Sequence, residues 1–294
     1  MDYYVEIKNE LINNEINRKV KNYSINKSDL NAYYKVGKIL SEAGKHYGEG
    51  IIKEYSKRLT KELGKGYTEA RLRYFRRFYV IFSKRPTLSD ELTFSHYCEL
   101  MWIKDINKMN YYINLSINYR LSVRQLKERI ISKEYERLPE DTRNKLKLNN
   151  KAGIKDLIKN PILIKNSNNY DEISEKLLQK IILENLPSFM KELGEGFCFI
   201  DNEYSIKVGQ SYNYIDLLLF NIKYNCYVVA ELKVTELKKE HIGQIEVYMN
   251  YIDNNLRLPT QDKTIDIIIC KQDNKYVIKY CSDSRIISRE YKLI

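Results

Sequence analysis

The sequence predicts a two-domain α+β protein, in which an all-α N-terminal domain precedes an α/β domain with a mixed sheet flanked by helices. Apolar residues recur at helical intervals from about residue 32 to residue 138. From residue 197 onward, short runs rich in β-branched and aromatic residues surround one long helical pattern. Residues 141–170 lose this periodicity and gather Asn, Lys and Gly. We therefore expect domains at residues 1–145 and 171–294, joined by a linker at 146–170.

The N-terminal region opens with a polar stretch that predicts a weakly packed lead-in over residues 1–30. Apolar positions then repeat at helical spacing over residues 32–63, with a break near the glycines at 44–50, which predicts a helical hairpin. Thr68 can cap the next helix, whose sequence is EARLRYFRRFYVIF.

Arginines are concentrated on the helix that follows Thr68, where four lie within seven residues: Arg71, Arg73, Arg76 and Arg77. Arg124 is on a later helix that Ser122 can cap. Because guanidinium groups match phosphates and guanine edges, these five residues are candidates for DNA contact. A solvated helix face is the alternative interpretation.

The charge of the chain is uneven. Lys and Arg number 50 and Asp and Glu 39, giving a net charge of +11. Residues 1–150 hold 30 basic and 19 acidic side chains, whereas residues 151–294 hold 20 of each. This distribution favours a polyanionic partner for the N-terminal domain.

No uninterrupted apolar run approaches the ~20 residues of a membrane span, so no membrane association is expected. The cysteines show no CxxC spacing and predict buried thiols in a reducing, cytoplasmic compartment: Cys98, Cys198, Cys226, Cys270 and Cys281.

The C-terminal region predicts a helix over residues 171–193 and a second helix from Lys239 to about Tyr251. Glu184, on the first of these helices, is a further candidate acid. The all-apolar run IDIIIC fits a central strand that is covered on both faces. The predicted strands are Phe197–Val208, Tyr214–Phe220, Tyr227–Lys233, Thr264–Lys271 and Lys275–Cys281.

Two carboxylates and a lysine lie on neighbouring strands of this predicted sheet. Asp216 interrupts the apolar run YIDLLLF, and the next strand, CYVVAELK, ends with Glu231 and Lys233. Glu231 and Lys233 are two residues apart and therefore project from the same face of their strand. If the hairpin register sets Asp216 opposite that pair, all three charges converge.

Such a cluster suits a hard divalent cation. Burying an unpaired carboxylate costs several kcal/mol, on the order of the penalty that normally excludes it. Carboxylates without His or Cys favour Mg²⁺ or Mn²⁺ over zinc, and an adjacent ammonium can stabilise charge on a phosphoryl group. The alternative is an ordinary same-face ion pair with an acid at the sheet edge.

The pattern Asp216, then Glu231-Leu232-Lys233, resembles the D…(D/E)xK signature of the PD-(D/E)XK nuclease superfamily. The order of GEGFCFI, YNYIDLLLF, CYVVAELK, GQIEVYMNYID and IDIIICK resembles its YhcG-type branch, and YFRRFY, LTFSHYCELM and LSVRQLKERI resemble the N-terminal domain that accompanies it. The resemblance implies a restriction-endonuclease-like fold, with Asp216 and Glu231 as metal ligands and Lys233 as the catalytic lysine. It also implies roles at that site for Gln244 and Tyr248, which lie one helical turn apart.

These expectations describe a metal-dependent nuclease that hydrolyses DNA, with a basic helical domain that grips its substrate. Its partners would be DNA and Mg²⁺ or Mn²⁺, with a homo-oligomer or a larger nucleic-acid complex left open. Two rival functions use the same residues. One is a catalytically silent DNA-binding or scaffold subunit, and the other is an RNA nuclease.

Overall fold

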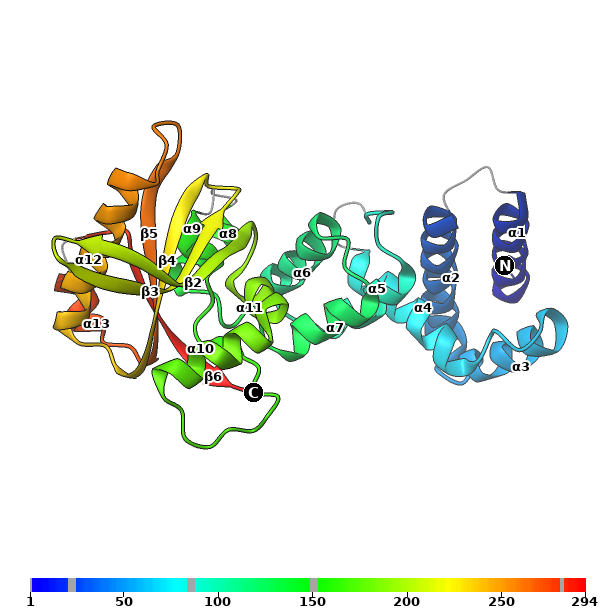
Figure 1. Ribbon diagram of the computed structural model, residues 1–294. Helices are drawn as coiled ribbons and strands as arrows, with labels where there is room; N and C mark the ends of the chain where they lie inside the picture. Colours follow the sequence, from blue (N-terminus) through cyan, green and yellow to red (C-terminus); the bar gives the residue numbers. More distant parts are fainter. Residues whose placement is uncertain (1, 21–24, 84–87, 149–152, 281–282) are drawn as a thin grey trace. The chain divides into compact units, whose positions relative to one another are not determined.

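The computed structural model describes residues 2–294 apart from 21–24, 84–87, 149–152 and 281–282. The chain divides into two compact units, Met1–Lys133 and Glu134–Ile294. Helices make up the described part of the first unit (Figure 1): α1 Tyr3–Val20, α2 Ile25–Tyr47, α3 Ile51–Leu63, α4 Glu69–Phe82, α5 Phe94–Leu100, α6 Ile106–Asn118 and α7 Val123–Ile131. None of the helices in the described ranges is long and apolar enough to cross a membrane.

The core of the first unit forms where α2 crosses α4. Gly37 permits this approach, since a Cβ there would lie 2.1 Å from the backbone oxygen of Phe75. Tyr33 stacks on the ring of Phe75 with centroids 4.3 Å apart. The expectation of a weakly packed lead-in is wrong, because α1 buries Ile7 and Leu11 in this unit. The mean hydropathy of residues 1–30 is low because most neighbours of these two apolar residues are polar, so the sequence did not predict their burial.

The second unit contains a six-stranded sheet in the order β1-β6-β5-β4-β3-β2. β2, β3 and β4 form an antiparallel meander, and α12 then crosses over to β5, which runs parallel to β4 and β6. The elements of this unit are α8 Glu140–Lys147, α9 Ile154–Leu157, β1 Ile162–Ile164, α10 Glu175–Glu184, α11 Leu186–Leu193, β2 Phe197–Val208, β3 Ser211–Asn221, β4 Cys226–Glu236, α12 Lys239–Asn255, β5 Asp262–Gln272, α13 Lys275–Tyr280 and β6 Ile286–Leu293.

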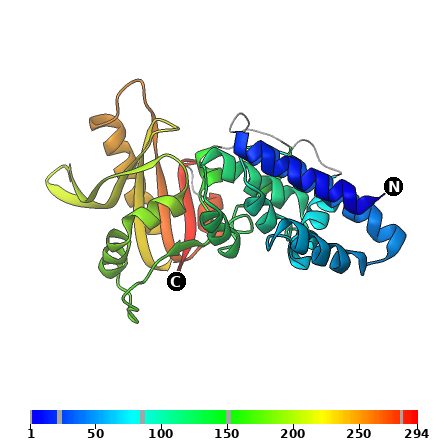
Figure 2. The same cartoon turned by 90° about the vertical axis from the view of Figure 1, so that its right-hand side faces the viewer.

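Helices cover both faces of this sheet (Figure 2). Apolar residues of α10 and α11, such as Ile181 and Phe189, pack against one face, where Val228 and Ile267 lie. Residues of α12 pack against the other face, among them Met249 and Tyr248. The mixed sheet flanked by helices and the buried central run IDIIIC, which is β5, are therefore confirmed.

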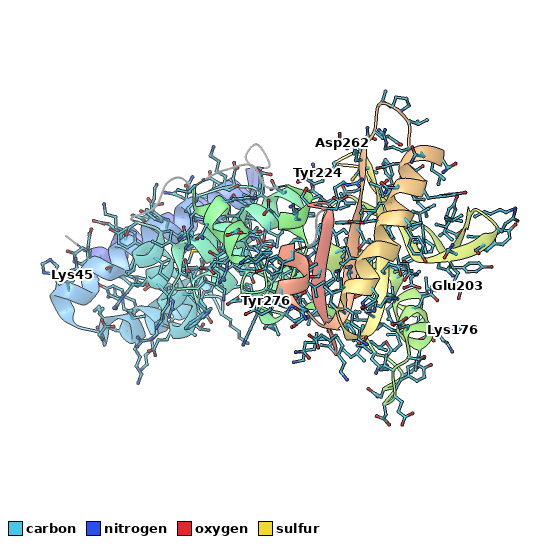
Figure 3. All side chains as sticks on the ribbon, turned by 90° about the vertical axis from the view of Figure 1, so that its left-hand side faces the viewer. Lys45, Lys176, Glu203, Tyr224, Asp262 and Tyr276 are labelled. Atoms are coloured by element: carbon cyan, nitrogen blue, oxygen red, sulfur yellow. The ribbon has the colours of Figure 1, made fainter. Side chains whose placement is uncertain are left out.

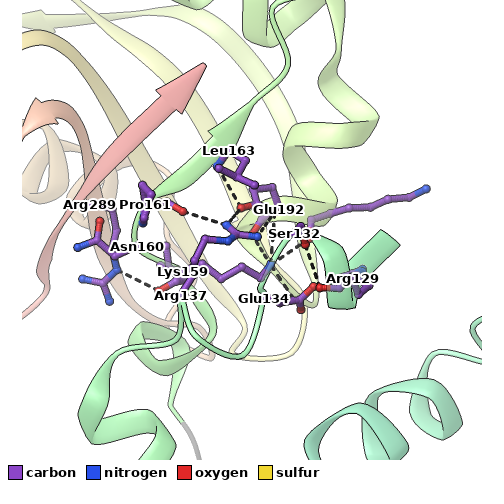
Figure 4. Close-up of polar contacts among 12 residues, drawn as sticks. Arg129, Ser132, Glu134, Arg137, Lys159, Asn160, Pro161, Leu163, Glu192 and Arg289 are labelled. Carbon is purple, nitrogen blue, oxygen red and sulfur yellow. Dashed lines mark hydrogen bonds and ion pairs between the residues drawn. The ribbon is translucent and has the colours of Figure 1, made fainter. Parts of the chain in front are cut away.

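The stretch expected to be a linker, residues 146–170, falls within the second unit. Ile162–Ile164 forms β1, which pairs in parallel with β6. A buried ionic cluster holds this segment in place (Figure 4): Arg137 bonds Glu192 and the carbonyl of Pro161, and Lys159 donates to the carbonyl of Glu192. Strands of three residues carry too little periodicity to be predicted from sequence.

The last strand also differs from the expectation. Residues 275–280 form α13 rather than a strand, because the Asn274 side chain accepts hydrogen bonds from the backbone N–H groups of Tyr276 and Val277 and starts a helical turn. The run KYVIKY mixes polar and apolar residues in the way a half-buried strand does, and this pattern led to the strand prediction. The sheet is completed instead by β6, Ile286–Leu293.

The expectation of buried thiols holds for Cys226 and Cys270, whereas Cys198 is exposed on β2 and Cys98 is half-buried. Cys281 lies outside the described residues.

Candidate active site

The site forms where β3 and β4 separate. Their ladder runs from Asn221↔Cys226 to Leu217↔Ala230 and then ends. Beyond it, the carboxyl group of Glu231 accepts from the N–H of Asp216 at 3.4 Å, and Asp216 Oδ2 accepts from the N–H of Leu232 at 2.8 Å. The carbonyl of Asp216 accepts from Gln179 of α10 at 2.8 Å. Side chains therefore replace the ladder bonds that the separated strands lose, which fixes both acids at the gap.

Burial makes this pair of acids electrostatically costly. Glu231 is only 2 % exposed, and its burial, together with the nearby Asp216 carboxylate, raises the pKa of Glu231 to about 8. Burial likewise raises the pKa of Asp216, although the hydrogen bond from Leu232 opposes the rise. Two facing carboxyls of this kind hold a proton at neutral pH unless a cation compensates them.

Lys233 supplies the positive charge within the site. Its Nζ lies 3.7 Å from Glu231 Oε2 and 3.4 Å from Glu175 Oε2. Burial acts to lower the pKa of Lys233, but attraction to Glu231, Glu175 and Asp216 outweighs it and raises that pKa. The ammonium is therefore held charged among three acids.

Glu175 is a site residue that the sequence did not reveal. It occupies the first turn of α10, after the cap Ser174, and its carboxyl remains half-exposed beside Lys233. Glu184, the acid proposed from the same helix, is exposed and accepts from Asn168 Nδ2 instead. Helical periodicity shows which face of a helix is buried but not which strand its first turn meets.

Gln244 and Tyr248 project from α12, which lies against the sheet. Gln244 Nε2 donates to the hydroxyl of Tyr248, whose ring is buried. Burial raises the pKa of Tyr248, the Gln244 bond opposes this, and Glu231 and Asp216 raise the pKa further. Both acids thus lie within electrostatic reach of the tyrosine hydroxyl, and the helical spacing of four brings Gln244 and Tyr248 together.

Comparisons with known proteins bear on both units. Residues 155–293 match the model of the YhcG PDDEXK nuclease domain, and residues 7–137 match that of the DUF1016 N-terminal domain. The chain therefore carries a YhcG PDDEXK nuclease domain preceded by a DUF1016 N-terminal domain. A relative from Escherichia coli (strain K12), named "Putative nuclease YhcG", is 26 % identical over 293 residues, covering 86 % of this chain and 78 % of that protein.

Solved structures give a more distant likeness to this YhcG-type chain. A repair endonuclease from Pyrococcus abyssi is 19 % identical, with a TM-score of 0.29, over 44 % of this chain and 49 % of that one. The EndoMS-dsDNA2 complex is 18 % identical, with a TM-score of 0.30, over 44 % of this chain and 48 % of that one. The YhcG-type chain therefore spans about half the length of these two solved chains.

One further acid of the YhcG-type nuclease domain lies behind the site. Asp266 of β5 pairs with Val229 in the register of β4 and is fully buried. Neither of its carboxyl oxygens has a hydrogen-bond partner in the described part of the chain. Burial, and then the charge of Glu231, raise the pKa of Asp266 well above its usual value. The sequence placed this residue in a buried strand without indicating a link to the site.

The donors at the site fit a hard divalent cation. Asp216 and Glu231 offer carboxyl oxygens, and their raised pKa values mark a place where positive charge would be stabilising. Within the described ranges no group of three or more His, Cys, Asp or Glu side chains is arranged to hold a metal ion. Ligands beyond these two carboxylates would therefore be water, backbone carbonyl or substrate oxygens, as Mg²⁺ commonly accepts.

The candidate DNA-binding arginines differ in what they contact. Arg76 makes a two-pronged pair with Glu49, and Arg77 lies 3.8 Å from the ring centroid of Trp102 and bonds the carbonyl of Met101. Arg71 donates to Tyr33 and to the carbonyl of Gly66, while Arg73 pairs with Glu69. Arg124 pairs with Glu128 but has a side chain that is 90 % exposed. The sequence could not show that Glu49, from another segment, neutralises part of this helix.

Proposed function

We propose that this protein is a metal-dependent nuclease that hydrolyses DNA phosphodiester bonds, with Asp216, Glu231 and Lys233 as its active-site residues. We also propose that its helical domain binds DNA. The observation that carries the proposal is the pair formed by the half-buried Asp216 and the buried Glu231 at the separated strands, with the Lys233 ammonium 3.7 Å from Glu231. Membership of a nuclease-domain family supports the same chemistry.

Asp216 and Glu231 would hold Mg²⁺ or Mn²⁺ through the oxygens that their backbone donors leave available. When bound, the metal supplies Lewis-acid polarisation of a phosphoryl oxygen and lowers the pKa of a bound water. The pKa of Lys233 is raised, so its ammonium is available to hold the attacking water or to stabilise charge that develops on the phosphate. Gln244, which donates to the Tyr248 hydroxyl, would orient that hydroxyl.

Binding of DNA by the helical domain rests on its charge, since the excess of basic over acidic residues lies in residues 1–150. Arg73 and Arg124 keep the most exposed guanidinium groups among the candidates, and their partners, Glu69 and Glu128, are themselves exposed. Exposed pairs of this kind contribute only about 0–1 kcal/mol, so a phosphate can replace the carboxylate at little cost.

A substrate panel tests the proposal. Duplex DNA, single-stranded DNA, branched DNA and RNA are incubated with the full chain in Mg²⁺, in Mn²⁺ and in EDTA. We expect cleavage of DNA with either metal and none with the chelator. Equal cleavage in EDTA would contradict the metal requirement, cleavage of RNA alone would identify an RNA nuclease, and binding without cleavage of any substrate would identify the silent subunit.

A further inference from the structure

An exposed β-arm extends from the active site. The β2–β3 ladder continues to Val208↔Ser211, whereas the β3–β4 ladder stops at Leu217↔Ala230. Residues 201–216, here called the arm, therefore lie past the point where β3 separates from β4. Figure 3 shows the arm projecting from the sheet beside α12, with Glu203 labelled on it.

The two faces of the arm differ sharply. Ile206 and Ile215 are buried and pack with Tyr248 and Ile252 of α12, which fixes the arm on the domain. On the other face, Tyr212 is 62 % exposed and Tyr214 is 58 % exposed. Two large aromatic rings are thus held in solvent on a supported strand, where they cover no core.

The exposed face leads directly to the site. Tyr212, Tyr214 and Asp216 alternate along β3, and alternate residues of a strand project to the same face. The pairing register sets Tyr212 opposite Lys207, whose ammonium lies 5.7 Å from the ring centroid of Tyr212. In the same register Ile215 lies opposite Tyr204 and Leu217 opposite Asn202, so Asp216 lies between two paired positions at the base of the arm. A ligand on the rings would therefore be continuous with one at the acids.

The spacing of the rings favours unpaired nucleotides over a duplex. Alternate residues of a strand are about 6.6 Å apart along its axis. Each strand of B-DNA advances only about 3.4 Å per nucleotide, so neighbouring stacked bases are too close together to reach one ring each. Bases that have left the stack can lie on successive rings, as on the aromatic platforms of proteins that bind single strands.

Charge on the arm argues for stacking rather than attraction to phosphates. Its exposed residues include Asp201 and Glu203 against Lys207. These three charges sum to −1, so base stacking on the tyrosine rings, rather than attraction to phosphates, would supply the binding at the arm.

We propose that the exposed face of the arm, Tyr212 and Tyr214 with Lys207, binds unpaired nucleotides of a DNA strand next to the phosphate that is cut. This inference rests on the proposed nuclease function and specifies its substrate class as single-stranded DNA or a duplex with an adjacent unpaired segment. The arm would hold the unpaired strand in line with Asp216.

The test measures binding of DNA to the full chain carrying Asp216→Asn, so that no substrate is cut. Three probes of the same sequence are used: a single strand, a blunt duplex and a duplex with a single-stranded tail, the unpaired nucleotides containing 2-aminopurine. Tyr212 and Tyr214 are changed together to alanine or together to phenylalanine. Tyr276→Ala, on the exposed face of α13, is the matched control.

We expect the alanine pair to weaken binding of the single strand and the tail by about thirty-fold or more and to restore 2-aminopurine emission, because two stacking contacts are lost. The phenylalanine pair, the control and all blunt-duplex affinities should stay near those of the parent. Unchanged single-strand binding in the alanine pair would overturn the inference, as would an equal loss on the blunt duplex. The inference would also be overturned if sedimentation showed that the parent protein is a dimer and the alanine pair a monomer. The two rings would then form a contact between copies of the chain.

Cleavage by the wild type in Mg²⁺ is measured in parallel, so that the two proposals fail separately. Wild-type cleavage with unaffected binding in the alanine pair would refute the arm alone. Absence of wild-type cleavage with selective loss of single-strand binding would refute the nuclease function and support the arm.

Discussion

Replacing Glu231 by glutamine should stabilise the metal-free protein at neutral pH. The Glu231 carboxyl is 2 % exposed and its pKa rises from 4.5 to about 8 on folding. The folded state therefore keeps a proton that the unfolded chain releases between these two values, so stability falls as pH rises through this window and levels off above it. At about 1.4 kcal/mol per pH unit, the accumulated cost at pH 7 is roughly 3 kcal/mol.

Glutamine is neutral throughout and escapes this cost, while its side-chain oxygen can still accept from the N–H of Asp216. Urea unfolding in EDTA at pH 4.5 and at pH 7 measures the effect. The gain of Glu231→Gln over the wild type should be near zero at the lower pH and about 3 kcal/mol at the higher one. Glu184→Gln, which changes an exposed carboxyl of α10, should show no such gain. An equal gain at both pH values, or a loss at pH 7, would refute the reasoning.

The site and the helical domain lead to three further predictions. Asp266→Asn should stabilise the protein above pH 3.8 and not below it, because burial raises the pKa of Asp266 and the folded state must otherwise keep that carboxyl protonated; unfolding across pH checks this, and a pH-independent difference would contradict it. Lys233→Ala should abolish or greatly slow cleavage while metal affinity measured by calorimetry holds or rises, since a neighbouring positive charge has been removed; a loss of metal binding would contradict that role. Changing Arg73 and Arg124 together to alanine should weaken DNA binding on all sequences and flatten its salt dependence by about one unit per lost phosphate contact, whereas Arg77→Ala should chiefly lower stability because its guanidinium packs on Trp102. An unchanged salt dependence of DNA binding in the double variant would favour the alternative interpretation, in which both arginines lie on a solvated helix face without contacting DNA.

The central part of the site was predictable because it depends on local geometry. Strand alternation places Glu231 and Lys233 on one face, and a short hairpin brings Asp216 to the neighbouring strand. Helical spacing likewise predicts that Gln244 and Tyr248 share a face. Each of these relations is settled by residues that are close in sequence or joined by a tight turn.

The remaining features depend on contacts between distant segments. Glu175 approaches Lys233 because α10 packs across β4, and Asp266 lies behind Glu231 because α12 carries the chain back to a parallel strand. Glu49 meets Arg76 from outside the arginine helix, which the charge pattern of that helix alone could not show. Sequence periodicity predicts the faces of such elements but not which faces meet.

The most direct test of the proposed metal-dependent nuclease activity is single-turnover cleavage of DNA in Mg²⁺ by the wild type and by Asp216→Asn. The substitution keeps the volume of the side chain and removes the carboxylate charge. The account predicts that cleavage is lost while DNA binding, assigned to the helical domain, stays near that of the wild type. Cleavage by Asp216→Asn at the wild-type rate would contradict the account.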